Sequence, residues 1–378
     1  MMKKKYVFIN NMAAPYQVKL CYALQKYFDA EFWFYEDLDG SRPLWWKIPL
    51  GDKCKIMKFS GKLKGIGYFS FGVFYDLIRF RPNIIVLSGF MKWNWIIFKI
   101  GKLINAKVVI MSEPLRYVSN DDSKSNDLIN KKNSYKKIKF LKKMFSKADL
   151  YLGMGEVAAN QFVEEFGFEE NKVKSTIYPQ DIEEYYSHPL RTKKVNKDYK
   201  LLFANRLVQR YQPIFALKVF KEINKMYPNL EMYMNNEGAQ KEECLEFITK
   251  NKIKNVHFIN EINSWNDMHL IYKKCDILIL PATYSNGNGT IIEARASGMG
   301  IVISNRINHI EKHSIDGENC YICNLDVNEF VKAIENYINK PELFTEHGNL
   351  SRKMVEYRKN ENTARIYYEL YKQCGLLD

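Results

Sequence analysis

Short apolar and β-branched runs alternate with amphipathic stretches along most of this chain. In the first half, the runs that predict strands occupy residues 6–10, 31–35, 84–87, 107–111, 150–153 and 174–177. Stretches with helical spacing lie between them, at residues 17–28, 93–104, 133–147 and 156–166. Strands that alternate with helices in this way predict a parallel sheet.

The same alternation restarts after a polar stretch at residues 191–200, which is typical of an interdomain linker. The second set of predicted strands is at residues 201–204, 231–234, 256–259, 277–280 and 301–304. The second set of predicted helices is at residues 213–226, 239–250, 264–274 and 290–297. Pro213 in a first helical turn and Ser264 as an N-cap are consistent helix starts.

A length of 378 residues suits two domains of similar size. We therefore predict an α/β protein with two Rossmann-like, doubly wound domains. The first is predicted to span residues 1–190 and the second residues 199–340. Residues 341–378 are predicted to be C-terminal helices that pack back towards the first domain. In sheets of this kind, ligands bind at the carboxyl ends of the strands.

Composition fits a soluble globular protein, with 46% hydrophobic and 26% charged residues. The net charge of +14 is unevenly placed, because residues 42–147 carry 23 basic and 6 acidic side chains. Such an excess indicates an anionic partner: a membrane surface, a phosphorylated substrate or nucleic acid. A lysine-rich, solvated surface is the alternative. The window contains no recognised nucleic-acid module, so we expect no nucleic-acid partner.

Neither a signal peptide nor a membrane span is expected, which predicts a cytoplasmic protein. Seven cysteines, an odd number, fit a reduced compartment. Cys320 and Cys323 form a single CxxC, which we interpret as a turn rather than a metal site. His309 and His313 flank Glu311, but HIEKH is not the order of a zinc protease. We therefore predict no metal.

Candidate chemistry gathers at residues 281–298, PATYSNGNGTIIEARASG. An apolar run ends in Pro281, a loop rich in Gly and Asn follows, and a helical pattern then ends at Gly298, a plausible C-cap. A strand, a glycine-rich loop and a helix N-terminus together form a cradle for a phosphate. Thr290 adds a hydroxyl at the first helical turn.

Glu293 lies one turn into the same predicted helix. From that position a carboxylate can accept both hydroxyls of a ribose, as the acidic residue of dinucleotide sites does. The alternative is that Glu293 only stabilises the helix dipole.

The second half resembles the donor domain of glycosyltransferase family 4, retaining enzymes with the GT-B fold. The residues that carry this resemblance are FANRLVQRYQPIFALKVFKEI at 203–223, YKKCDILILPATYSNGNGTIIEARASGMGIVIS at 272–304 and IEKHSIDGENCYI at 310–322. The first half resembles the family more loosely, through PYQVKL at 15–20 and ADLYLGMGEVAANQFVEEFG at 148–167. The resemblance implies two domains that face a central cleft, with residues 1–190 binding the acceptor and residues 199–340 binding the donor.

By position, the resemblance assigns the ribose contact to Glu293 and the donor-diphosphate contact to Arg206. A planar guanidinium suits a pyrophosphate and can stabilise it as a leaving group; an exposed surface ion pair is the alternative. The resemblance implies a nucleoside-diphosphate sugar as co-substrate, with UDP slightly favoured, and no metal. Gly287, Asn288, Gly289 and Thr290 would complete the donor site.

Several positions depart from the family pattern. Ser285 stands where the family has a glutamate that contacts the donor sugar. Tyr211 replaces a lysine, and the adjacent Arg210 is expected to supply the second positive charge. Glu113 stands near a strand end that often carries a histidine; it contacts a sugar or forms a buried pair with Arg116.

The acceptor side is less defined. Residues 10–16, NNMAAPY, lack the glycine pair of the commonest members, and Asn10, Asn11 and Tyr16 are the candidate acceptor contacts there.

These observations predict a retaining glycosyltransferase, with Glu113 and Arg206 as candidate catalytic residues. RPLWWK at 42–47 and MKWNWIIFK at 91–99 interleave Lys or Arg with Trp, which suits an anionic membrane surface. We therefore predict peripheral attachment at the inner face of the membrane and a lipid-linked saccharide acceptor, as in bacterial surface-polysaccharide assembly. The alternatives are a nucleotide-sugar epimerase of GT-B fold and a non-catalytic subunit that binds sugar nucleotides or glycans.

Overall fold

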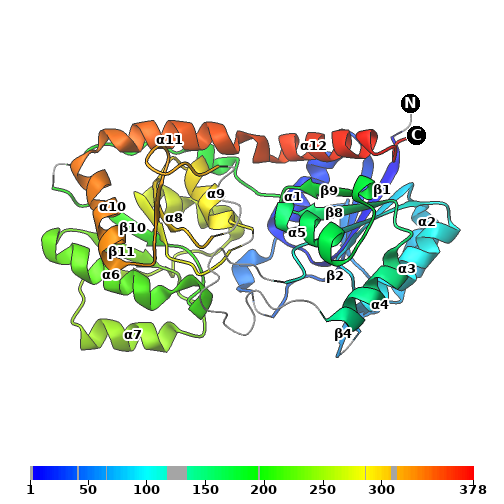
Figure 1. Ribbon diagram of the computed structural model, residues 1–378, viewed down its shortest axis with the longest axis horizontal. Helices are drawn as coiled ribbons and strands as arrows, with labels where there is room; N and C mark the ends of the chain where they lie inside the picture. The colour runs from blue at the N-terminus through cyan, green and yellow to red at the C-terminus, as the bar shows by residue number, and fades with distance from the viewer. Residues whose placement is uncertain are drawn as a thin grey trace. The chain divides into compact units, whose positions relative to one another are not determined.

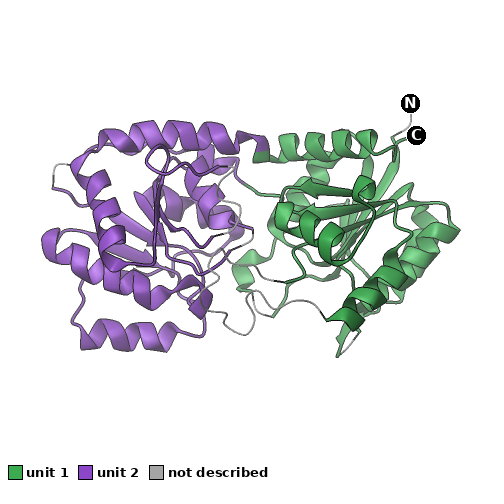
Figure 2. Cartoon of the chain, viewed as in Figure 1, with its two compact units in different colours: residues 1–117, 130–181, 358–378 green, residues 118–129, 182–357 purple. Residues whose placement is uncertain are grey.

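A computed structural model describes residues 3–40, 42–64, 66–116, 134–194, 196–285, 287–307 and 313–378. The chain divides into two compact units (Figure 2). The first unit contains the described residues up to Asp181 together with Arg358–Asp378, and the second contains Ile182–Tyr357. The last helix of the chain therefore belongs to the unit that holds the N-terminus.

A seven-stranded parallel sheet forms the centre of unit 1, in the order β3-β2-β1-β6-β7-β8-β9 (Figure 1). Its strands are β1 (Lys5–Met12), β2 (Asp29–Glu36), β3 (Cys54–Ile56), β6 (Ile84–Ser88), β7 (Lys107–Ser112), β8 (Leu150–Met154) and β9 (Val173–Thr176). The strand order reverses direction between β1 and β6, where ligands bind in doubly wound sheets.

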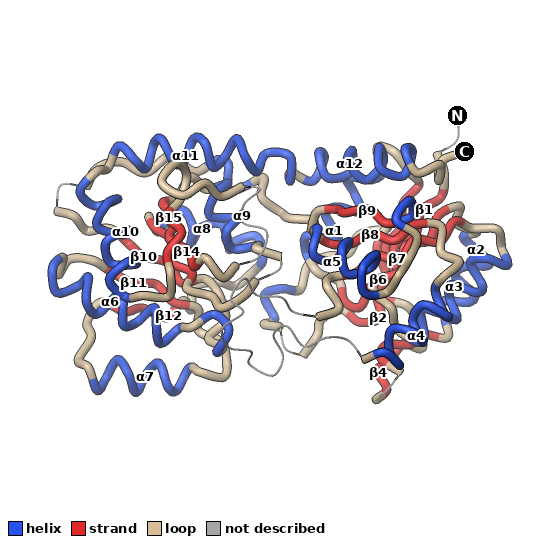
Figure 3. Tube along the Cα trace, in the orientation of Figure 1, coloured by secondary structure: helices blue, strands red, loops and turns tan. Residues whose placement is uncertain are grey.

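Helices cover both faces of this sheet, and alternate residues of each strand enter different cores (Figure 3). One face is covered by α2 (Gly72–Phe80), α3 (Lys92–Leu103), α4 (Tyr135–Phe145) and α5 (Glu156–Asn160). The other face is covered by α1 (Pro15–Leu24) and α12 (Asn360–Gln373). Tyr371 of α12 packs against Tyr6 of β1, with ring centroids 5.9 Å apart, which fixes the C-terminal helix to unit 1.

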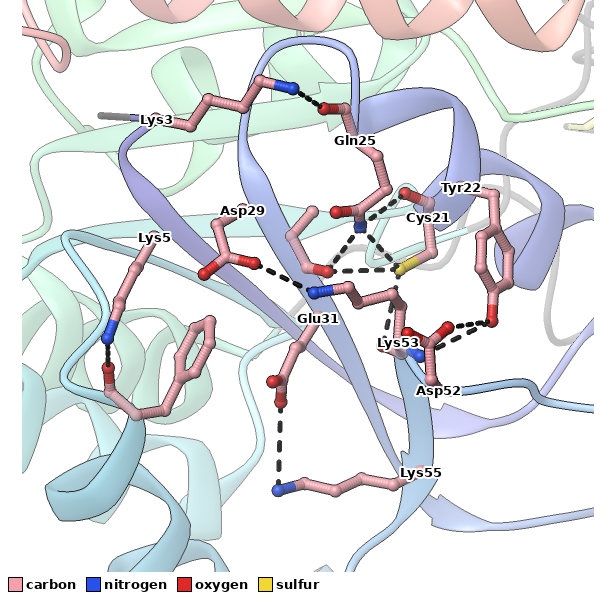
Figure 4. A network of polar contacts seen from close by, with 12 residues as sticks. Lys3, Lys5, Cys21, Tyr22, Gln25, Asp29, Glu31, Asp52, Lys53 and Lys55 are labelled. Carbon is pink, nitrogen blue, oxygen red and sulfur yellow. Dashed lines mark hydrogen bonds and ion pairs between the residues drawn. The ribbon is translucent and has the colours of Figure 1, made fainter. Parts of the chain in front are cut away.

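Ion pairs neutralise lysines along the β2–β3 edge of the sheet, and Figure 4 shows Lys53 with Asp29 and Lys55 with Glu31. Lys53 Nζ lies 3.1 Å from Asp29, and Lys55 Nζ lies 2.8 Å from Asp76. The Lys55 ammonium also lies 4.3 Å from the centroid of the Trp33 ring. These two lysines therefore add little to the unbalanced positive charge of unit 1.

Unit 2 contains a six-stranded parallel sheet in the order β12-β11-β10-β13-β14-β15. Its strands are β10 (Lys200–Phe203), β11 (Glu231–Met234), β12 (Val256–Phe258), β13 (Ile277–Leu280), β14 (Gly300–Ser304) and β15 (Tyr321–Cys323). Its helices are α6 (Pro213–Met226), α7 (Lys241–Lys250), α8 (Met268–Lys274), α9 (Gly289–Ala296), α10 (Val327–Asn339) and α11 (Glu342–Val355). The order reverses between β10 and β13.

The fold confirms the predicted doubly wound α/β architecture and most of the long elements. The predicted turn at Cys320–Cys323 is wrong, because Tyr321–Cys323 is the edge strand β15 and both thiols are buried. Among the described helices and strands, β15, β3, α2, α10 and the antiparallel hairpin of β4 (Ser60–Leu63) and β5 (Gly67–Ser70) were not predicted. All of these except α10 are short or lie in the lysine-rich window, where apolar periodicity is weak.

Candidate functional site

The candidate site lies in unit 2 where the strand order reverses. β10 and β13 are neighbouring parallel strands, so the loops that follow them leave the same edge of the sheet. The first loop contains Arg206 and Arg210, and the second contains Ser285 and leads into α9. The residues predicted to bind the donor therefore converge at the position where doubly wound sheets bind ligands.

Arg206 follows β10 and is half-buried. Its Nε is fully shielded from solvent and has no hydrogen-bond partner among the residues that the structure describes. Leaving a buried donor unsatisfied costs about 1–3 kcal/mol, and more when the group is charged. An anionic ligand that accepts from this guanidinium would remove that cost, which is consistent with the predicted diphosphate contact.

Arg210 joins the two loops. Its backbone carbonyl accepts hydrogen bonds from the amide and the hydroxyl of Thr283, at 2.8 and 3.2 Å. Its guanidinium donates to the Tyr211 hydroxyl at 2.6 Å and lies 4.4 Å from the centroid of that ring. The Tyr284 ring lies 5.4 Å from the same guanidinium. Tyr211, which replaces the family lysine, thus holds the adjacent cation in place.

The N-terminus of α9 is built as an anion-binding turn. Asn288 precedes the helix in a left-handed conformation, with φ of 52°, and its carbonyl accepts from Ile291 and Ile292. The amides of Gly289 and Thr290 lie in this first turn, at the positive end of the helix dipole. The Thr290 hydroxyl donates to the Asn205 side chain at 3.0 Å, which ties α9 to the loop after β10.

Glu293 lies one turn further along α9 and is 9% exposed. The buried Tyr272 of α8 donates its hydroxyl proton to Glu293 Oε2. Burial, followed by the charge of the Glu293 carboxylate, raises the pKa of the Tyr272 phenol well above its usual range. Tyr272 therefore stays a neutral donor and orients one oxygen of the carboxylate.

Two arginines hold the opposite end of α9. Arg191 donates to the carbonyls of Tyr272, Cys275 and Ser297, and burial lowers its pKa to about 10. Arg352 of α11 donates from Nε to the Ala296 carbonyl at 3.0 Å. These cations satisfy carbonyls at the negative end of the helix, and Arg191 also ties α8 to α9. The relative position of Tyr272 and Glu293 depends on this tie.

Ser285 is buried after β13, where the family has a carboxylate. Gly287 is half-buried and Asn288 is buried in the same loop. At position 285 a buried hydroxyl therefore replaces the acidic side chain of the family.

In unit 1, Asn10 and Asn11 end β1 and Tyr16 begins α1. Asn10 is buried: its side-chain nitrogen donates to Gln17, and its oxygen accepts from the Asn11 amide at 2.8 Å. The nitrogen of Asn10 therefore ties β1 to the first turns of α1, and its oxygen holds the neighbouring backbone of β1. Burial raises the pKa of the half-buried Tyr16 phenol to about 12. An acceptor contact of these three residues stays a prediction.

Glu113 follows β7 and is exposed. The buried Glu113–Arg116 pair considered as an alternative is wrong, because Arg116 Nε donates to Glu165 at 2.5 Å. Burial has the largest effect on the pKa of the Tyr16 phenol, and the positive charge of Arg42 lowers that pKa. The negative charge of Glu113 has a smaller effect and raises it. Glu113 and Tyr16 thus share one electrostatic neighbourhood in unit 1.

Three residues of the site were absent from the sequence-based prediction: Asn205, Tyr272 and Arg191. Tyr272 lies in an apolar helical pattern and therefore looks like an ordinary core residue. Arg191 lies in the stretch interpreted as a linker, although its side chain is buried. Only the fold brings both residues to α9.

A metal centre is absent from the described residues, where no group of three or more His, Cys, Asp or Glu side chains could hold an ion. His309 and Glu311 of the HIEKH stretch lie outside those residues. Among the helices that the structure describes, none is long and apolar enough to cross a membrane.

Several proteins of known structure share the fold of this chain. Over 98% of its length the chain resembles HepE from Anabaena, solved with UDP and glucose; the match covers all of HepE, with a TM-score of 0.67 and 13% identity. The lipopolysaccharide outer core galactosyltransferase WaaB is similar over 97% of this chain and 99% of its own, with a TM-score of 0.65 and 13% identity. The chain therefore has the GT-B fold of glycosyltransferases.

Sequence comparison finds a family match in the second half of the chain. Residues 188–361, less than half of the chain, match the family described as "Glycosyl transferases group 1". An uncharacterized glycosyltransferase of Haemophilus influenzae is 28% identical over 143 residues. That match spans 38% of this chain and 40% of the relative. The segment at residues 188–361 contains Arg206, α9 and Glu293.

Proposed function

We propose that this protein is a retaining glycosyltransferase that transfers a sugar from a nucleoside-diphosphate sugar, with UDP favoured, to a saccharide acceptor. The buried, unsatisfied Nε of Arg206 beside the N-terminus of α9 carries this proposal. Both groups favour an anion, and both lie in the segment that matches the glycosyltransferase family. The HepE structure with UDP and glucose supports the choice of donor class.

The proposed reaction needs charge stabilisation at the diphosphate. The bond between the anomeric carbon and the phosphate oxygen breaks, and the departing diphosphate gains negative charge. Arg206, Arg210 and the amides at the start of α9 would stabilise that charge, as positioned cations and backbone dipoles do in other transfer reactions. An acceptor hydroxyl forms the new bond to the anomeric carbon and gives its proton to the departing diphosphate oxygen.

Glu293 would accept the ribose hydroxyls, with its carboxylate oriented by Tyr272. Ser285 stands in place of the glutamate with which the family contacts the donor sugar. We therefore expect a donor sugar whose binding does not depend on that carboxylate. Glu113 would act on the acceptor side. The acceptor is proposed to be a lipid-linked saccharide of surface-polysaccharide assembly at the inner face of the membrane. The similar structure of WaaB, a lipopolysaccharide outer core galactosyltransferase, supports this choice of acceptor.

Titration calorimetry with UDP, GDP, ADP and their sugars tests the donor site. The wild type is expected to bind one nucleoside diphosphate, and Glu293→Ala to lose most of that affinity. Glu246→Ala, on the exposed surface of α7, is the matched control and should bind like the wild type. If Glu293→Ala binds as tightly as the control, the ribose contact is misplaced.

Transfer is then measured with the preferred donor and a panel of saccharide acceptors. Sugar appearing on an acceptor with the donor's anomeric configuration supports a retaining transferase. Isomerised free sugar nucleotide would instead favour an epimerase. Tight binding without turnover on any acceptor would favour a non-catalytic subunit.

A further inference from the structure

Unit 1 exposes an unusual number of large apolar side chains on one stretch of chain. Phe59 is 78% exposed, Phe71 59%, Tyr75 65% and Ile78 62%. Leu63, at the end of β4, is 51% exposed. We call these five residues the apolar face. Single exposed apolar residues are ordinary, but a contiguous group on a soluble domain marks an interaction site.

The five side chains come from two elements that are bonded together. The Phe71 amide donates to the Phe59 carbonyl at 3.2 Å, and the Gly72 amide donates to the Lys58 carbonyl at 3.1 Å. These bonds fix the start of the β4–β5 hairpin to the start of α2. Leu63 lies at the far end of β4, within the same hairpin.

Helix α2 is apolar on two opposite sides. Val73 and Leu77 are buried in the core of unit 1. Phe71, Tyr75 and Ile78 have the i, i+4, i+7 spacing of a second stripe, and that stripe faces solvent. An ordinary surface helix has a polar outer side. Phe71 also packs against Trp93 of unit 1, with ring centroids 5.4 Å apart, but the exposed Tyr75 and Ile78 are not required for packing within the unit.

Phe59 also has an unfavourable backbone. Its φ is 51°, in the left-handed region, which costs a residue with a side chain roughly 1–2 kcal/mol. Asparagine or glycine is the usual occupant of such a position. A strained phenylalanine with 78% of its surface exposed gains nothing from the core. The strain is consistent with a side chain held outward to contact a partner.

The charge around the apolar face is almost entirely positive. Residues 53–112 contain eleven Lys or Arg and a single acidic residue, Asp76, which pairs with Lys55 at 2.8 Å. Exposed cations lie close to the apolar face in sequence: Lys58 and Lys64 in the hairpin region, and Arg79 in α2. The next helices continue the pattern, since α3 contacts both α2 and α4. α4 adds exposed lysines at positions 136, 137, 139, 142 and 143.

One of the tryptophans that suggested a membrane surface from the sequence, Trp93, packs against other aromatic side chains of unit 1. Trp93 is half-buried, and its ring lies 5.4 to 5.9 Å from those of Phe69, Phe71 and Phe74. Trp93 therefore packs against the β4–β5 hairpin and against the start of α2.

We propose that the apolar face and its surrounding cations dock unit 1 onto an anionic lipid bilayer. Apolar side chains beside lysines and arginines match the acyl and headgroup layers of such a surface. Exposed aliphatic side chains such as Leu63 and Ile78 suit an acyl layer better than a single-stranded nucleic acid, which binds mainly through cations and aromatic stacking. The proposal deepens the proposed function, because a lipid-linked acceptor lies at that surface.

Vesicle co-sedimentation tests the proposal with the full chain. The variant Phe59→Asn/Phe71→Ser/Ile78→Ser removes three apolar side chains, and asparagine suits the left-handed position. Its matched control is Met226→Ser/Leu245→Ser/Leu270→Ser, three exposed apolar residues of unit 2. A second variant, Lys58→Gln/Lys64→Gln/Arg79→Gln, removes only charge. Far-UV circular dichroism and UDP binding verify that every variant is folded.

We expect the wild type to bind vesicles rich in phosphatidylglycerol and to leave phosphatidylcholine vesicles largely unbound. The apolar variant should lose at least about tenfold in affinity, since each inserted side chain buries surface in the membrane. The charge variant should also bind more weakly, and its residual binding should depend less on salt. The unit 2 control should remain within about twofold of the wild type.

Vesicle binding that is unchanged in the apolar variant would overturn the proposal, as would a wild type that ignores anionic vesicles. Binding to RNA homopolymers without binding to vesicles would assign the surface to a different partner. Failure of the proposed function has a separate signature. In that case UDP and its sugars do not bind the wild type, while vesicle binding and its loss in the apolar variant persist.

Discussion

Tyr272→Phe isolates the hydrogen bond that orients Glu293. The substitution removes one oxygen from a buried ring and leaves the packing of α8 against α9 in place. In the wild type the phenol donates to Glu293 Oε2, and Arg191 fixes the Tyr272 carbonyl. Only the first of these bonds is lost. The carboxylate then keeps its position on α9 but loses the donor that sets its direction.

The expected loss follows from the strength of that bond. A hydrogen bond to a charged group contributes about 1.5–3 kcal/mol, and about 1.4 kcal/mol corresponds to a tenfold change in affinity. We expect the Kd for UDP to rise about tenfold in Tyr272→Phe. The carboxylate also loses a buried donor, so unfolding free energy should fall by about 1–3 kcal/mol.

A modified nucleotide separates orientation from general damage. Titration calorimetry is carried out with UDP and with 2′,3′-dideoxy-UDP, which lacks the ribose hydroxyls that Glu293 would bind. If Tyr272 acts through Glu293, the substitution weakens UDP but changes the Kd of the dideoxy analogue by less than about twofold. Equal weakening of both nucleotides would refute the reasoning, because it would indicate a general distortion of the site.

Further outcomes follow from other groups in unit 2. Arg206→Gln should weaken UDP at least about tenfold while uridine, which lacks phosphates, binds as before; equal losses by calorimetry would contradict the diphosphate contact. Thr290→Val removes the 3.0 Å bond to Asn205 and should lower kcat/KM about tenfold with a loss of stability near 1 kcal/mol, measured by steady-state kinetics and urea unfolding. Burial lowers the pKa of His188 to about 3, so the unfolded chain binds a proton that the folded chain excludes between about pH 3 and 6.5. Stability from this group is complete above about pH 6.5 and should fall by up to about 1.4 kcal/mol per pH unit below it, and His188→Gln should flatten that slope in urea titrations.

The long elements of this fold could be predicted because each has a strong period. Alternating residues of β1 enter two cores, and the apolar stripe of α6 begins at Pro213 where the sequence places a helix start. Elements of three residues, such as β3 and β15, are fixed by pairing with a neighbouring strand. Their sequences contain too little periodicity to distinguish a strand from a turn.

Prediction of the site was limited in the same way. Arg206 and Glu293 could be located because a strand, a glycine-rich loop and a helix start stand in a recognisable order. Tyr272 lies 21 residues before Glu293, and no local pattern links a core tyrosine to that carboxylate. Such contacts depend on how α8 packs against α9, which is decided by the tertiary fold.

The most direct test of the central claim is a crystal structure of the protein with UDP. We predict that the diphosphate oxygens lie within hydrogen-bond distance of Arg206 Nε and of the amides that begin α9. The ribose hydroxyls should lie on the Glu293 carboxylate, with Tyr272 still bound to its other side. UDP bound elsewhere, with Arg206 Nε still unsatisfied, would contradict the account.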